Sequence, residues 1–147
     1  MDAKFDQNVL PWIGRIERQF SILMKEALAP LDLTYPEFRL VGVLWGEEEG
    51  HPQKYLAARL GLDASAVSVT LKSLEKNKIV ERVRDQNDAR IVRVKCAPKA
   101  YEMTQVLSAH SEQEMSATSG FSDTEKQQLL QLLTRVSQNL SQKTGLL

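Results

Sequence analysis

The chain has 147 residues, 42% of them hydrophobic, which is enough for one core of ordinary domain size. Its 19 basic and 19 acidic residues cancel, so the total charge alone points to no class of partner. No apolar run approaches the roughly 18 residues of a membrane span, the start has no signal-peptide character, and the single cysteine leaves no internal disulfide, so we expect a cytoplasmic protein without a membrane partner.

A long amphipathic helix is expected first, between residues 6 and 30. Asn8 or Asp6 can cap its start, Pro11 is tolerated in its opening turn, and apolar residues then follow helical spacing until Pro30. A helix of this kind needs another surface to pack against.

Three shorter helical patterns follow. Thr34 and Glu37 have the spacing of a capping box and predict the start of the first. Residues 53–60 and 64–76 each carry an apolar stripe, and the tripeptide 61–63 between them supplies a Gly to end one helix and an Asp to cap the next. Two helices joined by a tight turn with Gly are typical of a helix-turn-helix.

A two-stranded hairpin is predicted after the helix-turn-helix. Ile79–Arg84 and Arg90–Cys96 are rich in β-branched residues that alternate with charges, and residues 85–89 between them favour a turn. Residues 54–99 contain eleven basic and five acidic side chains, a net charge of +6, which leaves −6 for the remainder. A helix-turn-helix with a wing and a basic surface is a DNA-binding architecture.

Two more helices complete the pattern. Pro98 can open one that runs towards Thr118, and Ser122 with Glu125 forms a second capping box before a regular apolar stripe. The sequence therefore predicts a mostly α protein with a small β-hairpin wing (α+β), a winged helix-turn-helix flanked by long helices. The apolar faces of the first and last helices favour a homodimer; the alternative is a monomer in which they pack on each other.

At these residues the chain resembles the MarR family of winged helix-turn-helix regulators. The resemblance rests on residues 33–40, on residues 56–76, and on the wing, where Ile79–Arg82 is followed by Asp88-Ala89-Arg90 in the family's Asp-x-Arg pattern. It implies a single MarR-like domain over residues 1–147. Residues 33–97 would form its DNA-binding lobe, and residues 6–30 and 98–144 would form its dimerisation helices.

Two positions depart from the family pattern. The family usually has Gly at the end of the recognition helix, where this chain has Lys78 after Asn77, and we expect Asn77 to take the left-handed conformation. The family usually reads Leu-Thr-x-x-Gly after the wing, where this chain has residues 96–100, and we expect Pro98 to compensate partly for the missing Thr cap.

The second helix of the helix-turn-helix is the expected recognition helix. With its apolar stripe towards the core, small residues near its start can approach base edges, and lysines farther along suit phosphates. Ser68 can bond either kind of base pair, and Val69 or Ala66 can touch a thymine methyl. The alternative is a plain solvated face. The expected DNA-binding residues of this helix are Ser65, Ala66, Ser68, Val69, Lys72 and Lys76.

The wing supplies the other expected DNA contacts. Arg90 at the hairpin tip can enter a narrow minor groove, and Asp88 can hold its side chain in place. The alternative is an Asx-turn at Asp88 with a surface ion pair. Arg84, with Arg82 and Arg93, is expected near phosphates.

The resemblance implies a homodimeric, sequence-specific transcriptional regulator that binds a pseudo-palindromic operator in double-stranded DNA, a repressor relieved by a small aromatic or anionic effector. The alternatives are a winged module used for protein–protein contact and a regulator without an effector. Candidate effector contacts, which can equally be core residues, are Trp12, Ile16, Phe20, Tyr35, Phe38 and Arg39.

Enzymatic and metal chemistry find no support in the sequence. No nucleophile has a base at usable spacing and no phosphate loop is present, and His51 and His110 are too isolated to suggest a metal site. No cofactor is expected. Cys96 lies among apolar strand residues, which favours an inert buried thiol over a redox sensor.

Overall fold

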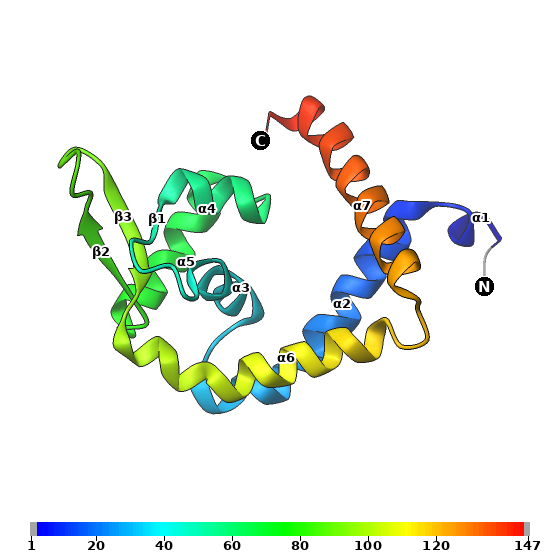
Figure 1. Cartoon of the computed structure of the whole chain (residues 1–147), viewed down its shortest axis with the longest axis horizontal. Helices are drawn as coiled ribbons and strands as arrows, with labels where there is room; N and C mark the ends of the chain where they lie inside the picture. The colour runs from blue at the N-terminus through cyan, green and yellow to red at the C-terminus, as the bar shows by residue number, and fades with distance from the viewer. Residues whose placement is uncertain (1–2, 146–147) are drawn as a thin grey trace.

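A computed structural model describes residues 3–145 and is predominantly helical, with one small antiparallel sheet (Figure 1). The helix-turn-helix and the sheet form one lobe, and the first long helix and the last two helices extend away from it. The elements in chain order are α1 (Ala3–Asp6), α2 (Val9–Leu28), the 3-10 helix η1 (Ala29–Leu31), α3 (Tyr35–Leu44), β1 (His51–Pro52), α4 (Gln53–Leu60), α5 (Ala64–Lys76), β2 (Val80–Arg84), β3 (Val92–Cys96), the 3-10 helix η2 (Pro98–Met103), α6 (Thr104–Ala117) and α7 (Asp123–Thr144).

Both predicted capping boxes are present. At the start of α3 the Glu37 amide donates to Thr34 Oγ1 at 3.3 Å, and the Thr34 amide donates to Glu37 Oε2 at 2.9 Å. Ser122 and Glu125 make the same reciprocal pair before α7. Each box satisfies two amides that a helix start leaves without partners, which is why the pattern locates these helices well.

The turn of the helix-turn-helix also forms as predicted. Gly61 ends α4 with φ of 64°, and the Leu62 amide reaches back to the Ala57 carbonyl at 3.0 Å. Asp63 caps α5, where its carboxylate accepts from the Ala66 amide at 2.7 Å. The recognition helix therefore starts at a fixed position relative to α4.

The expectation for Asn77 is wrong, because the left-handed residue is Lys78. Asn77 has φ of −84° and Lys78 has φ of 60°. The Lys78 amide bonds the Glu75 carbonyl and the Ile79 amide bonds the Leu74 carbonyl, so the helix ends in a Schellman motif one residue later than expected. Lys78 pays a steric cost that Gly would avoid.

The predicted two-stranded hairpin is in fact a three-stranded sheet of order β1-β3-β2. His51 of β1 pairs with Val94 of β3, which places the start of α4 against the wing. Gly50 makes this approach possible: its φ is +65°, and a Cβ there would lie 2.1 Å from the Val94 carbonyl oxygen. A strand of two residues shows no alternation, so no pattern in the sequence indicates it.

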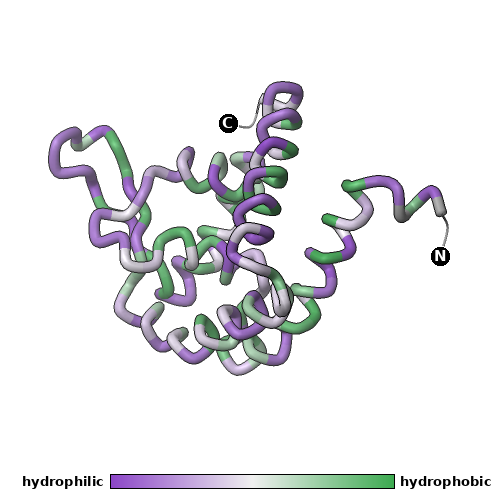
Figure 2. The backbone as a smooth tube through the Cα atoms, turned by 45° about the vertical axis from the view of Figure 1, so that its right-hand side comes forward, coloured by the Kyte–Doolittle hydropathy of each residue, from purple (hydrophilic) through white to green (hydrophobic). Residues whose placement is uncertain are grey.

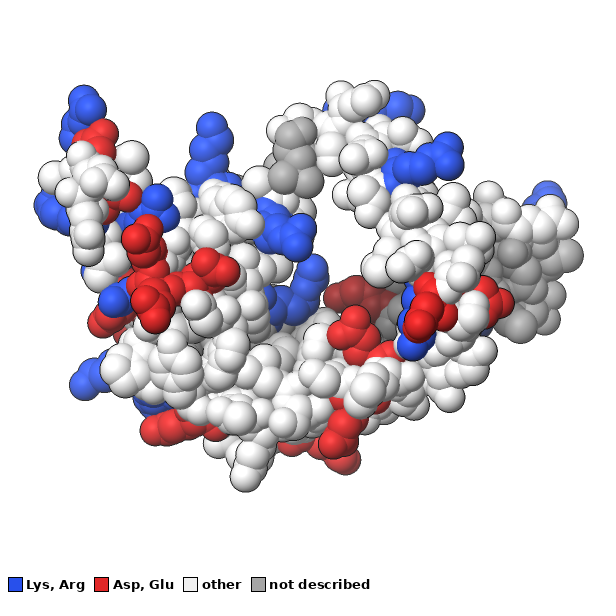
Figure 3. All heavy atoms as spheres, viewed as in Figure 1, with Lys and Arg blue, Asp and Glu red and all other residues white. Residues whose placement is uncertain are grey.

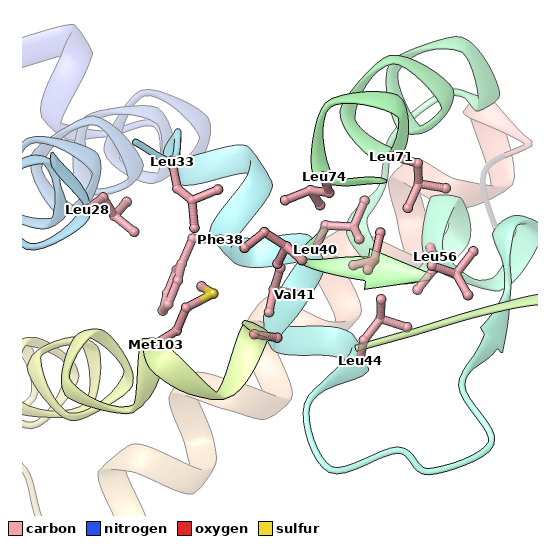
Figure 4. Close-up of a cluster of buried hydrophobic side chains, with 14 of the residues drawn as sticks. Leu28, Leu33, Phe38, Leu40, Val41, Leu44, Leu56, Leu71, Leu74 and Met103 are labelled. Atoms are coloured by element: carbon pink, nitrogen blue, oxygen red, sulfur yellow. The ribbon is translucent and has the colours of Figure 1, made fainter. Parts of the chain in front are cut away.

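The core extends through the lobe and into both neighbouring helices. Figure 4 shows α3 at its centre, with Phe38 facing Met103 and Leu28 on one side, and Val41 and Leu44 on the side of α4 and α5. Helix α2 contributes only residues from its second half to this cluster, and α6 contributes from its start. The helix-turn-helix lobe and the inner ends of α2 and α6 therefore form one packed body.

The segment after the wing differs from the expected single helix. Pro98 opens a 3-10 helix up to Met103, and the regular α-helix α6 begins only at Thr104. Without a side-chain cap at its start, the chain turns through this tighter helix, which buries Ala100 and Met103 before α6 leaves the core.

Helix α7 is the least packed element. None of its 22 residues, all of which the structure describes, is buried. Leu129, Leu132, Leu133 and Leu140 are 39–55% exposed along its stripe, and Figure 2 shows hydrophobic segments recurring along this helix up to the C-terminal end. Across residues 3–145, no helix combines the length and the apolar character needed to cross a membrane.

Candidate nucleic-acid interface

Helix α5 presents one well-defined outer face. Val67, Leu71 and Leu74 are fully buried, which fixes the rotation of the helix about its axis. Of the residues expected at DNA, Ala66 and Ser68 are half-buried, whereas the following four are exposed: Ser65, Val69, Lys72 and Lys76. Val69 is 70% exposed and lies nearer the centre of this face than Ser68 does.

Two hydroxyl groups of α5 are already engaged. Ser65 Oγ donates to Asp63 Oδ1 at 2.7 Å, and Thr70 Oγ1 donates to the Ala66 carbonyl at 2.9 Å. The bonds from Ala66 and Ser65 lower the pKa of the Asp63 carboxyl, so the cap stays ionised at neutral pH.

The wing is tied to the helix-turn-helix by Arg82. Its Nε forms an ion pair with Glu75 of α5, and its Nη1 donates to Gln53 Oε1 of α4 at 3.2 Å. Arg82, which was expected near phosphates, therefore donates hydrogen bonds to Glu75 and Gln53 within the lobe. The contact couples the orientation of the sheet to that of the recognition helix.

At the wing tip Arg90 is held by Asp88 in a two-pronged ion pair. Arg90 Nε and Nη2 lie 3.0 Å from the two carboxylate oxygens, and the Arg90 amide also donates to Asp88 Oδ1 at 3.0 Å. The bonds from Arg90 lower the pKa of Asp88. The Arg90 side chain is nevertheless 91% exposed, so a guanidinium of fixed orientation projects from the end of the hairpin.

The base of the wing contains a second set of ionic contacts. Asp85 accepts from Arg93 Nε at 2.5 Å and from the Asn87 amide at 2.8 Å, and the Arg93 bond is the main cause of a lowered pKa of Asp85. Arg93 Nη1 also donates to the Gly50 carbonyl at 2.9 Å. Arg93, expected near a phosphate, is thus a half-buried link between the wing and the segment before α4. Arg84, exposed beside it, donates to the Ala89 carbonyl.

In Figure 3 cations project from the wing tip and from the upper part of the lobe, and acidic side chains lie beside them at the wing, on the front of the lobe and along the lower edge of that view. The net charge of residues 54–99 is +6. Within residues 3–145, no three His, Cys, Asp or Glu side chains are grouped so that they could hold a metal ion.

A cleft of about 630 Å³ lies between α3, α4 and α6. Three of the expected effector contacts, Tyr35, Phe38 and Arg39, line it. Phe20 lies beside it, with its ring centroid 6.1 Å from that of Tyr35. Trp12 and Ile16 are not among the lining residues. The Trp12 ring is tilted by 59° against that of Phe5 and lies under the Arg15 guanidinium near the start of α2, and Ile16 is 56% exposed.

Sequence reasoning missed several residues of this cleft. His51, Tyr55 and Arg59 line one wall, and the rings of His51 and Tyr55 stack at 4.2 Å. Tyr55 and Arg59 are four residues apart and lie on one face of α4, a signal that was available in the sequence, whereas His51 lies in β1 just before this helix. His110 of α6 completes the opposite wall, where its ring lies 5.4 Å from that of Phe38. Its partners come from distant segments, so local spacing could not identify it.

Cys96 is half-buried between β3 and α3. Its Sγ lies 4.0 Å from the Val41 carbonyl oxygen, and burial raises the pKa of the thiol to about 11. At neutral pH almost no thiolate forms, which agrees with the expected unreactive thiol.

A family model described as MarR family matches residues 31–91, and curated transcriptional regulators are similar to this chain in sequence. The transcriptional regulator MgrA of Staphylococcus aureus is 33% identical over 105 residues, which cover 71% of this chain and 70% of that protein. The regulator TtmR of Methylorubrum extorquens is 40% identical over 75 residues, 51% of this chain, but the match spans only 38% of its own length.

Solved structures share the fold over almost the whole chain. A MarR family regulator from Listeria monocytogenes in complex with a 26mer DNA has a TM-score of 0.81 at 23% identity, covering 92% of this chain and 91% of that one. CouR from Rhodococcus jostii RHA1, bound to p-coumaroyl-CoA, has a TM-score of 0.82 at 20% identity, covering 92% and 95%.

Proposed function

The chain belongs to the MarR family of transcriptional regulators, and from this premise we propose that it is a homodimeric repressor that binds a pseudo-palindromic operator and is released by a small-molecule effector. The family and the fold are those of regulators with a DNA-binding winged helix, not of enzymes. The observation that carries the proposal is the preorganised Arg90 at the wing tip beside the exposed face of α5.

The two elements suit the two grooves of duplex DNA. The exposed face of α5 has small side chains at its start and Lys72 and Lys76 farther on, which fits a helix whose first turns approach bases in the major groove. Arg90 would enter the adjacent minor groove, where a narrow groove concentrates negative potential. Asp88 limits the side-chain entropy lost on binding, because the guanidinium is already oriented.

A second copy of the chain would cover the exposed apolar faces of the long helices. Val9, Leu10 and Ile16 of α2 are 56–57% exposed, and α7 has no buried residue. Apolar faces of this extent are typical of an interface between copies. The resulting two-fold axis would place two copies of α5 in successive major grooves about one helical turn apart.

The effector would occupy the cleft between α3, α4 and α6. Aromatic rings line it, and the two positive charges of Arg39 and Arg59 outweigh the one negative charge of Glu47, which fits a small aromatic anion. Of the structural neighbours, CouR is bound to an aromatic acyl-CoA, which carries negative charge. A ligand that binds more tightly at one separation of α6 from the lobe would shift the protein towards that separation. The resulting change in DNA affinity is set by the difference between the ligand's affinities for the two states.

The proposal is tested by binding to duplex DNA from the region upstream of the protein's own gene, titrated against salt. Tight, sequence-selective binding should weaken steeply with salt, by about a thousandfold between 50 and 200 mM if six or more phosphates are neutralised. Arg90→Ala should weaken it by about tenfold per half-site. Arg135→Ala, which removes an exposed arginine of α7 away from its apolar stripe, is the matched control and should have little effect.

Two results would contradict the proposal. The first is weak binding, both to the upstream duplex and to duplexes selected from a random pool, that does not depend on sequence, salt or Arg90. This result would favour a winged module used for protein–protein contact. Selective binding by a monomer would refute the homodimer.

A further inference from the structure

Val69 occupies an unusual position for a branched apolar residue. It lies in the second turn of α5, and at 70% it is the most exposed large hydrophobic side chain among the described residues. Counting 100° per residue, it projects almost directly opposite the buried Val67, Leu71 and Leu74. A residue at this point is the first that a surface facing the helix would meet.

The side chains around Val69 provide few means of reading bases by hydrogen bonds. The first ten residues of α5 contain no Arg, Asn or Gln, the residues that pair with guanine or adenine through two bonds, and its first long side chain is Lys72. The Ser65 and Thr70 hydroxyl protons are directed at Asp63 and at the Ala66 carbonyl. What the first turns present outward is mainly methyl groups.

We infer that Val69 selects a thymine in each operator half-site by packing against its 5-methyl group. In the major groove this methyl distinguishes thymine from the three other bases, and apolar side chains are its natural contacts. The inference rests on the proposed function, because it requires α5 to lie in the major groove. It assigns specificity to the valine at the centre of the face and a lesser part to the half-buried Ser68.

Thymidine and deoxyuridine differ only by this methyl group, which gives a direct test. Operator duplexes selected from a random pool are remade with deoxyuridine at one thymine at a time, and their dissociation constants are measured for the wild type, Val69→Ala and Val92→Ala. Val92 is an exposed valine of β3 and serves as the matched control. At one thymine per half-site the wild type and Val92→Ala should lose about fourfold in affinity, the effect of one buried methyl-sized group.

Val69→Ala should bind the thymine and deoxyuridine duplexes equally at that position, because the contact is already lost. The inference is overturned if no thymine-to-uracil change weakens the wild type, or if the loss is the same in Val69→Ala. Selective, salt-dependent binding without methyl dependence would refute this inference alone, whereas failure to select any duplex would refute the proposed function with it.

Discussion

The lobe from α3 to β3 and the terminal helix α7 differ in what happens to their apolar side chains, which are buried in the lobe and exposed on α7. In the lobe Leu40, Leu44, Leu56 and Leu71 are fully buried within one chain. In α7, which is nearly twice as long as α5, the apolar stripe is exposed along its length. The lobe therefore buries its apolar residues within one chain, in a core to which α2 and α6 contribute, whereas no residue of α7 is buried in the described chain.

The largest expected effect would come from breaking the proposed partner surface of α7. Leu133→Glu places a charge in the apolar stripe, where burial would cost several kcal/mol, and should convert the dimer to monomers. Operator affinity should then fall by a hundredfold or more, because the two half-sites no longer act together. Sedimentation and DNA binding measure both effects.

Gln138→Glu is the matched control, since Gln138 lies off the stripe on the same helix. A Leu133→Glu protein that remained a dimer with unchanged operator affinity would show that α7 is not part of the interface.

The lobe should instead be most sensitive to a change within its own chain, at Gly50. Gly50→Ala would bring a Cβ to 2.1 Å from the Val94 carbonyl oxygen, in a backbone conformation of φ +65°. We expect a loss of about 3 kcal/mol in the free energy of unfolding, measured by urea denaturation at fixed protein concentration.

Gly46→Ala separates the two causes of that loss. Gly46 also has positive φ, at +79°, but no atom lies within 4 Å of its added Cβ. It should cost only about 1–2 kcal/mol from backbone strain. Equal losses at the two glycines would mean that the approach of β1 to β3 is not tight.

The reactivity of the Cys96 thiol tests whether the core of the lobe forms without a second copy of the chain. With its pKa raised from 9.0 to about 11, the thiolate fraction at pH 8 falls by about a hundredfold. Alkylation by iodoacetamide should be correspondingly slow in the folded protein, reach its half-maximal rate only near pH 11, and become fast in urea. The rate should be the same in Leu133→Glu; faster reaction there would mean that the core of the lobe depends on the dimer.

The smallest effect is expected at the end of α5. Lys78→Gly removes the strain of a left-handed lysine, which stabilises the folded state, but it also gives the unfolded chain more conformational entropy. We expect the free energy of unfolding to rise by about 0.5–1 kcal/mol in total. Asn77→Gly, at an ordinary φ of −84°, should instead destabilise the protein in the same urea titration. The opposite ranking would place the left-handed residue at Asn77.

Features that depend on a few neighbouring residues could be predicted from the sequence. The capping boxes at Thr34 and Ser122 and the turn at Gly61 involve partners within five residues, and all three are present. The error at Asn77 came from one residue of helix length, which local patterns rarely fix.

Features that depend on distant segments could not be predicted in this way. Strand β1 exists only because β3 lies beside it, and Arg93 bonds the Gly50 carbonyl across 43 positions of chain. The cleft combines residues of α3, α4 and α6, so only its α3 residues were anticipated.

Helix α6 gives the molecule a mechanical property. Its 14 residues form a rod of about 21 Å that starts at the packed Met103 and ends beside the turn into α7. Leu107 and His110, which line the cleft, lie near the inner end of this rod. A tilt of about 10° produced there moves the outer end by about 4 Å. If the proposed effector binds in the cleft, the rod would act as a lever, and a small displacement there would be magnified at α7, where the spacing between two lobes would be set.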